Sequence, residues 1–328
     1  MSHDRSRHAS LAAVKLGALV REHLGQTLHN TPGAFAGGAA FVHDGAAWVL
    51  AADERPERAL GPALAWARAN GCSALNLLAD SATGLLARRA RLFDEPPAIW
   101  QVIGRELVVA EPAPLPERIP LDPRFEVFRD QIAAAGAAPV VEHGVLAGEV
   151  DGLEVCRAIL DPQADGGVRL AVGIGPHDRD AFQLVHGGVP IASALAGVVE
   201  KISAVRHPGA PPHALNRLVQ ERAVRAELIR HPSLVGAATL ALAEPPVPRT
   251  NPKEATPCVA AGTGLDGEPM VVVCSVGIDL DLVPFAADAR LATDPDARLV
   301  LAVPARDAHP VTRALAARLT RRAVIATV

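Results

Sequence analysis

Apolar positions along the first hundred residues switch between helical and strand-like spacing. Ser10 is placed to cap a first helix, whose apolar stripe consists of Leu16, Leu19, Val20, Leu24 and Leu28. Apolar runs over 39–42 and 47–51 then flank Asp44-Gly45, a dipeptide typical of tight hairpins. The pattern therefore predicts a helix followed by a hairpin.

Helices and strands alternate in the next stretch. A helix over about 56–70, ended by Gly71, precedes a buried strand over 74–79. Asp80 and Ser81 are suited to cap a helix that reaches residue 92, and a strand over 98–103 follows it.

The C-terminal part of the chain follows the same order. A helix over 213–230 precedes apolar runs over 259–261 and 270–274, which flank Asp266-Gly267. A helix near 282–289 and a strand over 298–303 come next. Asp307 is placed to cap a helix to residue 319, and a strand over 323–328 ends the chain.

The spacing of the strands is similar in these two parts. Strands start near 47, 74 and 98 in the first and near 270, 298 and 323 in the second. We interpret the parts as an internal duplication of one helix–hairpin–αβαβ module. The alternative is two unrelated α/β modules, because strand–helix–strand units have similar lengths.

Proline-rich segments divide the chain. We predict a first α/β module over 1–110, a Pro-rich linker over 111–123, an acidic α+β middle segment over 124–206 and a second α/β module over 207–328 with a Pro-rich loop over 244–257. The predicted fold class is α/β (α+β overall), with two helix–hairpin–αβαβ modules flanking a smaller α+β middle segment.

Charge and composition narrow the function classes. The chain has 32 basic and 36 acidic residues, and residues 111–212 alone carry 14 acidic against 8 basic ones. This mild acidity, with 3% aromatic residues and no tyrosine, disfavours a nucleic-acid coat and a stacking surface. Only three of the basic residues are lysine, which is typical of a high-GC bacterial composition.

Neither a targeting segment nor a cysteine motif is evident. The N-terminus lacks the pattern of a signal peptide, and the longest uncharged stretch, 181–199, contains glycine and proline, so we expect a cytoplasmic protein. The four cysteines show no metal-binding spacing. Cys156 and Cys274 lie in apolar runs, where cysteine is usually a small hydrophobic residue.

The order helix, hairpin, helix, strand, helix, strand resembles the PD-(D/E)XK nuclease superfamily, which has the restriction-endonuclease-like fold. Residues 266–319 are most similar to it, and residues 10–104 resemble it more weakly. The resemblance implies a hairpin strand that carries Glu-x-Lys. In that family the glutamate and an aspartate of the neighbouring strand hold Mg²⁺, since a hard cation needs carboxylate oxygens.

The chain departs from this pattern at the catalytic positions. The Glu-x-Lys position falls at Cys274-Ser275-Val276 in the second module and at about Ala51-Ala52-Asp53 in the first. Both modules are therefore expected to have a degenerate active site. We interpret the acids just after these strands as helix-start caps: Asp53, Glu54, Asp279 and Asp281.

The acidic middle segment offers an alternative site. Residues 141–160 and 168–175 are predicted to be two paired strands, on which Glu149 and Asp151 share a face and would ligate Mg²⁺ or Mn²⁺. Glu154 stands among apolar residues, where burial would raise its pKa. His177 and Arg179, at the start of the next helix, would assist.

Structural interpretations compete with these assignments. Glu149 and Asp151, with Arg157 nearby, also fit a solvated, ion-paired strand face, and Glu154 also fits an error of one residue in the strand phase. Gly173-Ile174-Gly175 is suited to bind phosphate, whereas Asp178 and Asp180 would satisfy the helix start themselves. A further set fits a basic stripe, a solvated face or a subunit contact: Arg217, Arg222 and Arg225.

The leading hypothesis is a cytoplasmic protein with degenerate nuclease-like modules that acts through a protein partner or as a homo-oligomer, without catalysis and without a cofactor. One alternative is a metal-dependent hydrolase or nuclease with its site at Glu149, Asp151 and Glu154. Another is a nucleic-acid-binding accessory protein, which the net charge does not favour. No membrane partner is expected.

Overall fold

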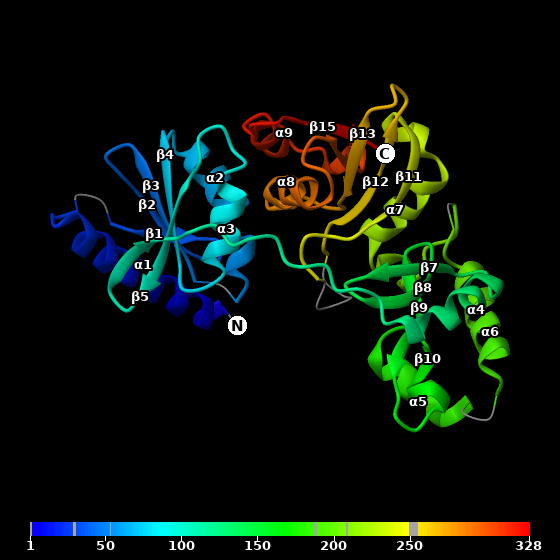
Figure 1. The fold of residues 1–328 in the computed structure, drawn as a ribbon. Helices are drawn as coiled ribbons and strands as arrows, with labels where there is room; N and C mark the ends of the chain where they lie inside the picture. The colour runs from blue at the N-terminus through cyan, green and yellow to red at the C-terminus, as the bar shows by residue number, and fades with distance from the viewer. Residues whose placement is uncertain (1, 29–30, 53, 187–188, 208, 249–254) are drawn as a thin grey trace. The chain divides into compact units, whose positions relative to one another are not determined.

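A computed structural model describes residues 2–28, 31–52, 54–186, 189–207, 209–248 and 255–328. The chain divides into two compact units. Residues 1–115, 278–291 and 308–325 belong to the first, and residues 116–277, 292–307 and 326–328 belong to the second. Two mixed sheets stand before and after an antiparallel sheet in the chain, which confirms the α/β (α+β) fold class (Figure 1).

The first sheet has six strands that lie in chain order. They are β1 (Gly33–Phe35), β2 (Gly38–His43), β3 (Ala46–Ala51), β4 (Ala74–Ala79), β5 (Ala98–Ile103) and β6 (Glu106–Val109). The β2–β3 hairpin turns at Asp44-Gly45, where both residues have positive φ, as the dipeptide predicts. Strand β4 is parallel to β3 and to β5, and β6 returns antiparallel to β5.

Helices cover both faces of this sheet. Helix α1 (Ser2–Leu24) lies on one face, and α2 (Leu60–Ala69), preceded by the 3₁₀ turn η1 (Pro56–Arg58), and α3 (Thr83–Ala90) lie on the other (Figure 1). The predicted stripe of α1 packs Leu16 and Val20 against Trp48 and Leu50. Ser10 lies inside α1, so its assignment as the cap is wrong.

The middle segment folds around an antiparallel sheet of order β10-β9-β8-β7. Its elements are η2 (Pro123–Phe128), α4 (Arg129–Ala134), β7 (Ala138–Glu142), β8 (Val145–Val150), β9 (Leu153–Leu160), η3 (Asp165–Gly167), β10 (Val168–Val172), α5 (Pro176–His186) and α6 (Ile191–Ser203). Ile132, Leu146, Val155 and Leu195 form the centre of its core. Residues 111–122, which make up most of the predicted linker, form no helix or strand.

The prediction of one strand over 141–160 is wrong. His143-Gly144 and Asp151-Gly152 adopt positive φ in succession and turn the chain twice, so three strands replace one. Paired positive φ values are what a two-residue hairpin turn needs. The dipeptide rule that located the hairpin at Asp44-Gly45 applies equally at Asp151-Gly152.

The C-terminal sheet has five strands in chain order. Its elements, with the helical segments before them, are η4 (Ala214–Arg217), α7 (Gln220–Arg230), η5 (Pro232–Val235), β11 (Ala237–Ala243), β12 (Cys258–Gly264), β13 (Pro269–Cys274), β14 (Arg298–Val303) and β15 (Ala323–Thr327). Strands β11, β12 and β13 are antiparallel, and β14 is parallel to β13. Leu228 of α7 packs on Cys258 and Ala260. Strand β11 went unrecognised in the sequence.

Two C-terminal helices group with the first unit. They are α8 (Leu282–Thr293) and α9 (Pro310–Ala316), which follows η6 (Ala305–Asp307), and α9 contacts α2. The cap of α9 is His309, whose Nδ1 accepts from the Val311 amide at 3.2 Å. The assignment of Asp307 as this cap is wrong, because its carboxylate accepts from the Gly277 amide instead. Among the described helices, none is both long and apolar enough to span a membrane.

At Gly61 the backbone of α2 lies very close to the backbone of the segment that precedes α8. A Cβ at this position would lie 1.9 Å from the carbonyl oxygen of Leu280. We therefore expect Gly61→Ala to lower the free energy of unfolding, measured by urea denaturation, by about 2–3 kcal/mol, because a backbone carbonyl cannot rotate away.

Gly197→Ala in α6 is the matched control for this prediction. Nothing lies within 4 Å of a Cβ at Gly197, and alanine is the better helix former. This variant should gain about 0.5–1 kcal/mol. Equal responses of the two variants would contradict the steric argument.

Candidate functional site

Glu149 on β8 is buried and ion-paired. Its carboxylate accepts from Arg222 and from Arg225 Nη2 (3.3 Å), and Glu142 accepts from the same two arginines, with Arg225 Nη1 at 2.7 Å. We name these four residues the α7 ion cluster. Burial by itself raises the pKa of Glu142, but the guanidinium groups of Arg225 and Arg222 hold this pKa below its usual value.

Asp151 lies in a turn and is paired with an arginine that does not bind Glu149. It has a φ of 43° at the start of the β8–β9 turn, and its Oδ1 accepts from Arg230 Nη2 at 2.7 Å. Its carbonyl oxygen accepts from Arg206 Nε at 3.0 Å. Asp151 and Glu149 are therefore bound by different arginines rather than sharing one face of a continuous strand.

Glu154 on β9 is held by two arginines. Its carboxylate accepts from Arg157 at 2.7 and 2.8 Å and from Arg179 Nη1 at 2.6 Å. Burial alone would raise the pKa of Glu154, but hydrogen bonds and charge from Arg157 and Arg179 lower it below its usual value. The lowered pKa is opposite to the shift that suits a general acid near neutral pH.

The start of α5 contains the two predicted helper residues. Arg179 reaches Glu154, whereas His177 lies exposed on the first turn of the helix. Asp178 Oδ2 accepts from the Ile174 amide at 2.6 Å. The chain thus places its own carboxylate on an amide of the Gly173-Ile174-Gly175 loop, where a phosphate would otherwise bind.

The structure brings Glu154 and Arg179 together but binds the three candidate carboxylates to separate sets of arginines. These are Arg222 and Arg225 for Glu149, Arg230 for Asp151, and Arg157 and Arg179 for Glu154. Within the described part of the chain, no three His, Cys, Asp or Glu side chains are grouped closely enough to hold a metal ion.

A second charged cluster lies in the first unit and was not foreseen. Asp288 of α8 has no exposed surface and accepts from Arg88 Nε at 2.8 Å and from Arg89 Nε at 3.2 Å. Arg89 Nη1 also donates to Asp281 at 3.0 Å, and Arg58 donates to Asp279 at 2.6 Å. We name these six residues the aspartate–arginine network. Asp279 accepts from the amide of Asp281, which precedes α8, and Asp281 itself is a buried ion-pair partner. Asp53 lies outside the described residues.

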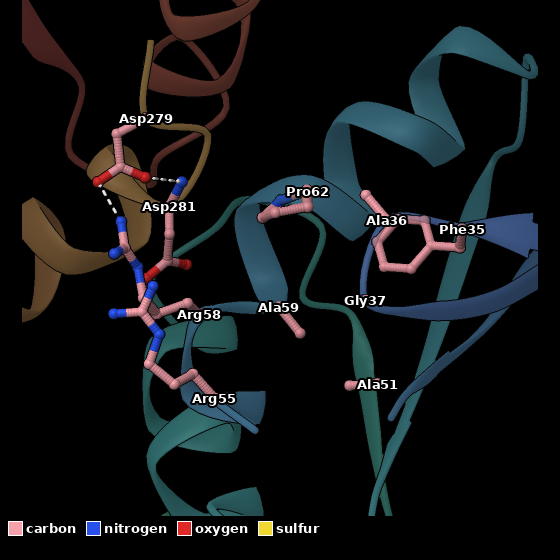
Figure 2. A pocket seen from close by; sticks show the side chains of 10 residues that line it. All are labelled: Phe35, Ala36, Gly37, Ala51, Arg55, Arg58, Ala59, Pro62, Asp279 and Asp281. Atoms are coloured by element: carbon pink, nitrogen blue, oxygen red, sulfur yellow. Dashed lines mark hydrogen bonds and ion pairs between the residues drawn. The ribbon is translucent and has the colours of Figure 1, made fainter. Parts of the chain in front are cut away.

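A pocket of about 270 Å³ adjoins this network at the carboxyl end of β3. Figure 2 shows Phe35, Ala36 and Pro62 on one side and the polar groups of Arg55, Arg58 and the two aspartates on the other. Ala51, the first residue of the vacated Glu-x-Lys position, also lines it. Sequence reasoning missed this pocket because its walls come from segments more than two hundred residues apart.

Asp281 is a titratable group of this pocket whose pKa is strongly displaced. Burial, opposed by Arg89 and reinforced by Asp279, raises the pKa of Asp281 to about 7. Native Asp281 therefore keeps its proton where the unfolded carboxyl, with an ordinary pKa of 3.8, has lost it. Its contribution to stability is complete below about pH 4 and is lost as the pH rises towards 7.

We expect Asp281→Asn to remove this pH dependence. Between pH 4 and 7, the free energy of unfolding of the variant should rise relative to wild type by up to about 1.4 kcal/mol per pH unit. Urea denaturation across this range measures the difference, with Asp80→Asn at an exposed position as the control. A flat or opposite trend for Asp281→Asn would refute the raised pKa.

Comparisons with known proteins give no match: no family model fits the chain, and neither a curated protein nor a solved structure is significantly similar to it.

Proposed function

We propose that this chain is a non-catalytic protein built from two degenerate restriction-endonuclease-like modules, and that it acts by self-association. The arrangement of the strands supports the ancestry. In each mixed sheet an antiparallel hairpin, β2–β3 or β12–β13, is followed by a strand parallel to its second member. The repeated order also supports an internal duplication.

The single observation that carries the non-catalytic role is the pairing of acids with arginines. Ala51 and Cys274 end β3 and β13 where the resemblance places the metal-binding glutamate. Asp279 and Asp281, the acids that line the pocket together with Ala51, are bound by Arg58 and Arg89. Guanidinium groups neutralise the oxygens that Mg²⁺ would need, so cation binding would require breaking these pairs.

Nuclease assays test this role directly. The purified protein should leave single- and double-stranded DNA and RNA intact in Mg²⁺ and in Mn²⁺, and neither ion should raise its melting temperature. Metal-dependent cleavage that Asp151→Asn abolishes, and that the exposed control Asp165→Asn keeps, would instead establish the hydrolase. Binding to nucleic acid that weakens steeply with salt would favour the accessory protein.

The outer face of α1 supports self-association through a helix. Leu11 and Val14 lie about one turn apart and are 63% and 72% exposed. Apolar side chains at this spacing suit contact with the same helix of a second copy. Sedimentation velocity should show a species larger than the monomer that grows with concentration.

Charged side chains introduced on this face should dissociate the assembly into monomers. Leu11→Glu/Val14→Glu should sediment as a monomer, whereas Leu265→Glu, at a similarly exposed position in the β12–β13 turn, should behave as wild type. A wild-type protein that is monomeric at every concentration would overturn self-association. Unchanged assembly of the double variant would exclude the α1 face.

A further inference from the structure

Two of the four cysteines face each other across a strand pair. Cys258 of β12 and Cys274 of β13 are direct partners in the antiparallel register. Such partners have Cα atoms about 4.5–5.5 Å apart, and disulfides span about 4.4–6.8 Å between Cα atoms. Both thiols are free and buried, and they are hydrogen-bonded to each other. The backbone therefore already holds them within bonding range.

The surroundings of the two sulfur atoms differ. Cys258 lies beneath α7, where its thiol donates a hydrogen bond to the carbonyl oxygen of Glu221 at 3.1 Å. Burial by itself raises the pKa of Cys258, but the hydrogen bond from Cys274 and the charges of Arg225 and Arg222 lower this pKa below its usual value. The hydrogen bond to Cys258 and burial raise the pKa of Cys274 well above the usual value.

Cys258 is therefore the thiol of the pair that loses its proton more readily, whereas Cys274 holds its proton more tightly. A thiolate is the attacking form of cysteine, and a second thiol within bonding range resolves the oxidised product. Arg225 and Arg222 of the α7 ion cluster favour ionisation of Cys258, whereas Glu142 of the same cluster opposes it, and the net effect is a lowered pKa for Cys258.

We propose that Cys258 and Cys274 form a redox-active dithiol that hydrogen peroxide converts into a cross-strand disulfide. The Cys258 thiolate attacks one peroxide oxygen, the O–O bond breaks, and the departing hydroxide takes the proton of Cys274 to become water. Cys258 is then a sulfenic acid. The Cys274 sulfur attacks it, the S–O bond breaks, and the leaving hydroxide takes from solvent the proton that Cys258 released on ionising, which gives a second water. Together the two sulfur atoms lose two electrons, and the peroxide gains them.

Alkylation and mass spectrometry of the native full-length chain test this proposal. The protein is treated with hydrogen peroxide, quenched with catalase, unfolded in N-ethylmaleimide and digested. We expect two of the four thiols to escape alkylation, a mass about 2 Da lower before alkylation, and one peptide pair that links Cys258 to Cys274. The Cys72→Ser/Cys156→Ser variant should keep this product, and Cys258→Ser should lose it.

The wild-type result alone decides the question, whether or not the variants fold. Four alkylatable thiols, after a peroxide dose that fully oxidises free glutathione, would overturn the proposal. A disulfide that includes Cys72 or Cys156 would also overturn it. So would an equal yield of the Cys258–Cys274 link in urea-unfolded protein, because the native strand pairing would then play no part. None of these outcomes bears on the proposed self-association.

Discussion

We expect Asp288→Ala to lower the free energy of unfolding by about 3–5 kcal/mol. Asp288 has no exposed surface, and its two oxygens accept hydrogen bonds from both Arg88 and Arg89. Removing the carboxylate leaves two buried guanidinium groups whose positive charge is no longer balanced by the carboxylates around them. Leaving a buried charge unpaired lowers the free energy of unfolding by more than the intact ion pair contributes to it.

Two further variants isolate the electrostatic cause of this loss. Asp288→Asn keeps the side-chain volume but removes the charge and replaces one acceptor oxygen with an NH2 group that cannot accept from the arginines, so it should lose nearly as much stability as Asp288→Ala. Asp80→Ala breaks an exposed pair with Lys15 in the same unit and should cost no more than about 1 kcal/mol. Urea denaturation measures all three. A well-tolerated Asp288→Asn would show that packing, not charge, dominates at this position.

We expect an effect of similar size from Arg225→Ala in the α7 ion cluster. Arg225 is 1% exposed and donates to Glu142 at 2.7 Å and to Glu149 at 3.3 Å. Without it, two buried carboxylates share Arg222 alone, and a cavity opens beneath α7. The free energy of unfolding should fall by about 3–5 kcal/mol.

Arg298→Ala is the matched control in the same unit. Arg298 pairs with Asp266 at 2.8 Å, but both side chains are more than a third exposed, so the loss should be about 0–1 kcal/mol. The free energies of unfolding from urea titrations give the comparison. Equal losses for Arg225→Ala and Arg298→Ala would contradict the role assigned to burial.

Strands with an apolar run and a turn signal were predictable from local sequence. The runs at 74–79 and 298–303 coincide with β4 and β14, because strands that are largely covered on both faces read as continuous apolar segments. The run at 98–103 coincides with β5, which is only partly buried. Asp44-Gly45 identified its hairpin for an equally local reason. The prediction of one strand over 141–160 is wrong although the sequence contains a local turn signal there, Asp151-Gly152.

The charged clusters were not predictable in the same way. Glu149 fits an ion-paired strand and Arg225 a basic helical stripe, and each interpretation is reasonable for its own segment. The structure buries both and pairs them across 76 positions of sequence. One signal was available: residues 111–212 carry an excess of acid that must find cations elsewhere in the chain or in solvent.

The sequence by itself determined the positions of β4, β5 and β14, the hairpin at Asp44-Gly45 and the absence of carboxylates at Ala51 and Cys274, since periodicity, turn residues and residue identity are local properties. Only the tertiary structure decided which acids meet which arginines, and that Cys258 faces Cys274. The physical reason is that burial and pairing depend on contacts between segments distant in the chain. A carboxylate, guanidinium or thiol acquires its charge state from those contacts rather than from its sequence neighbours.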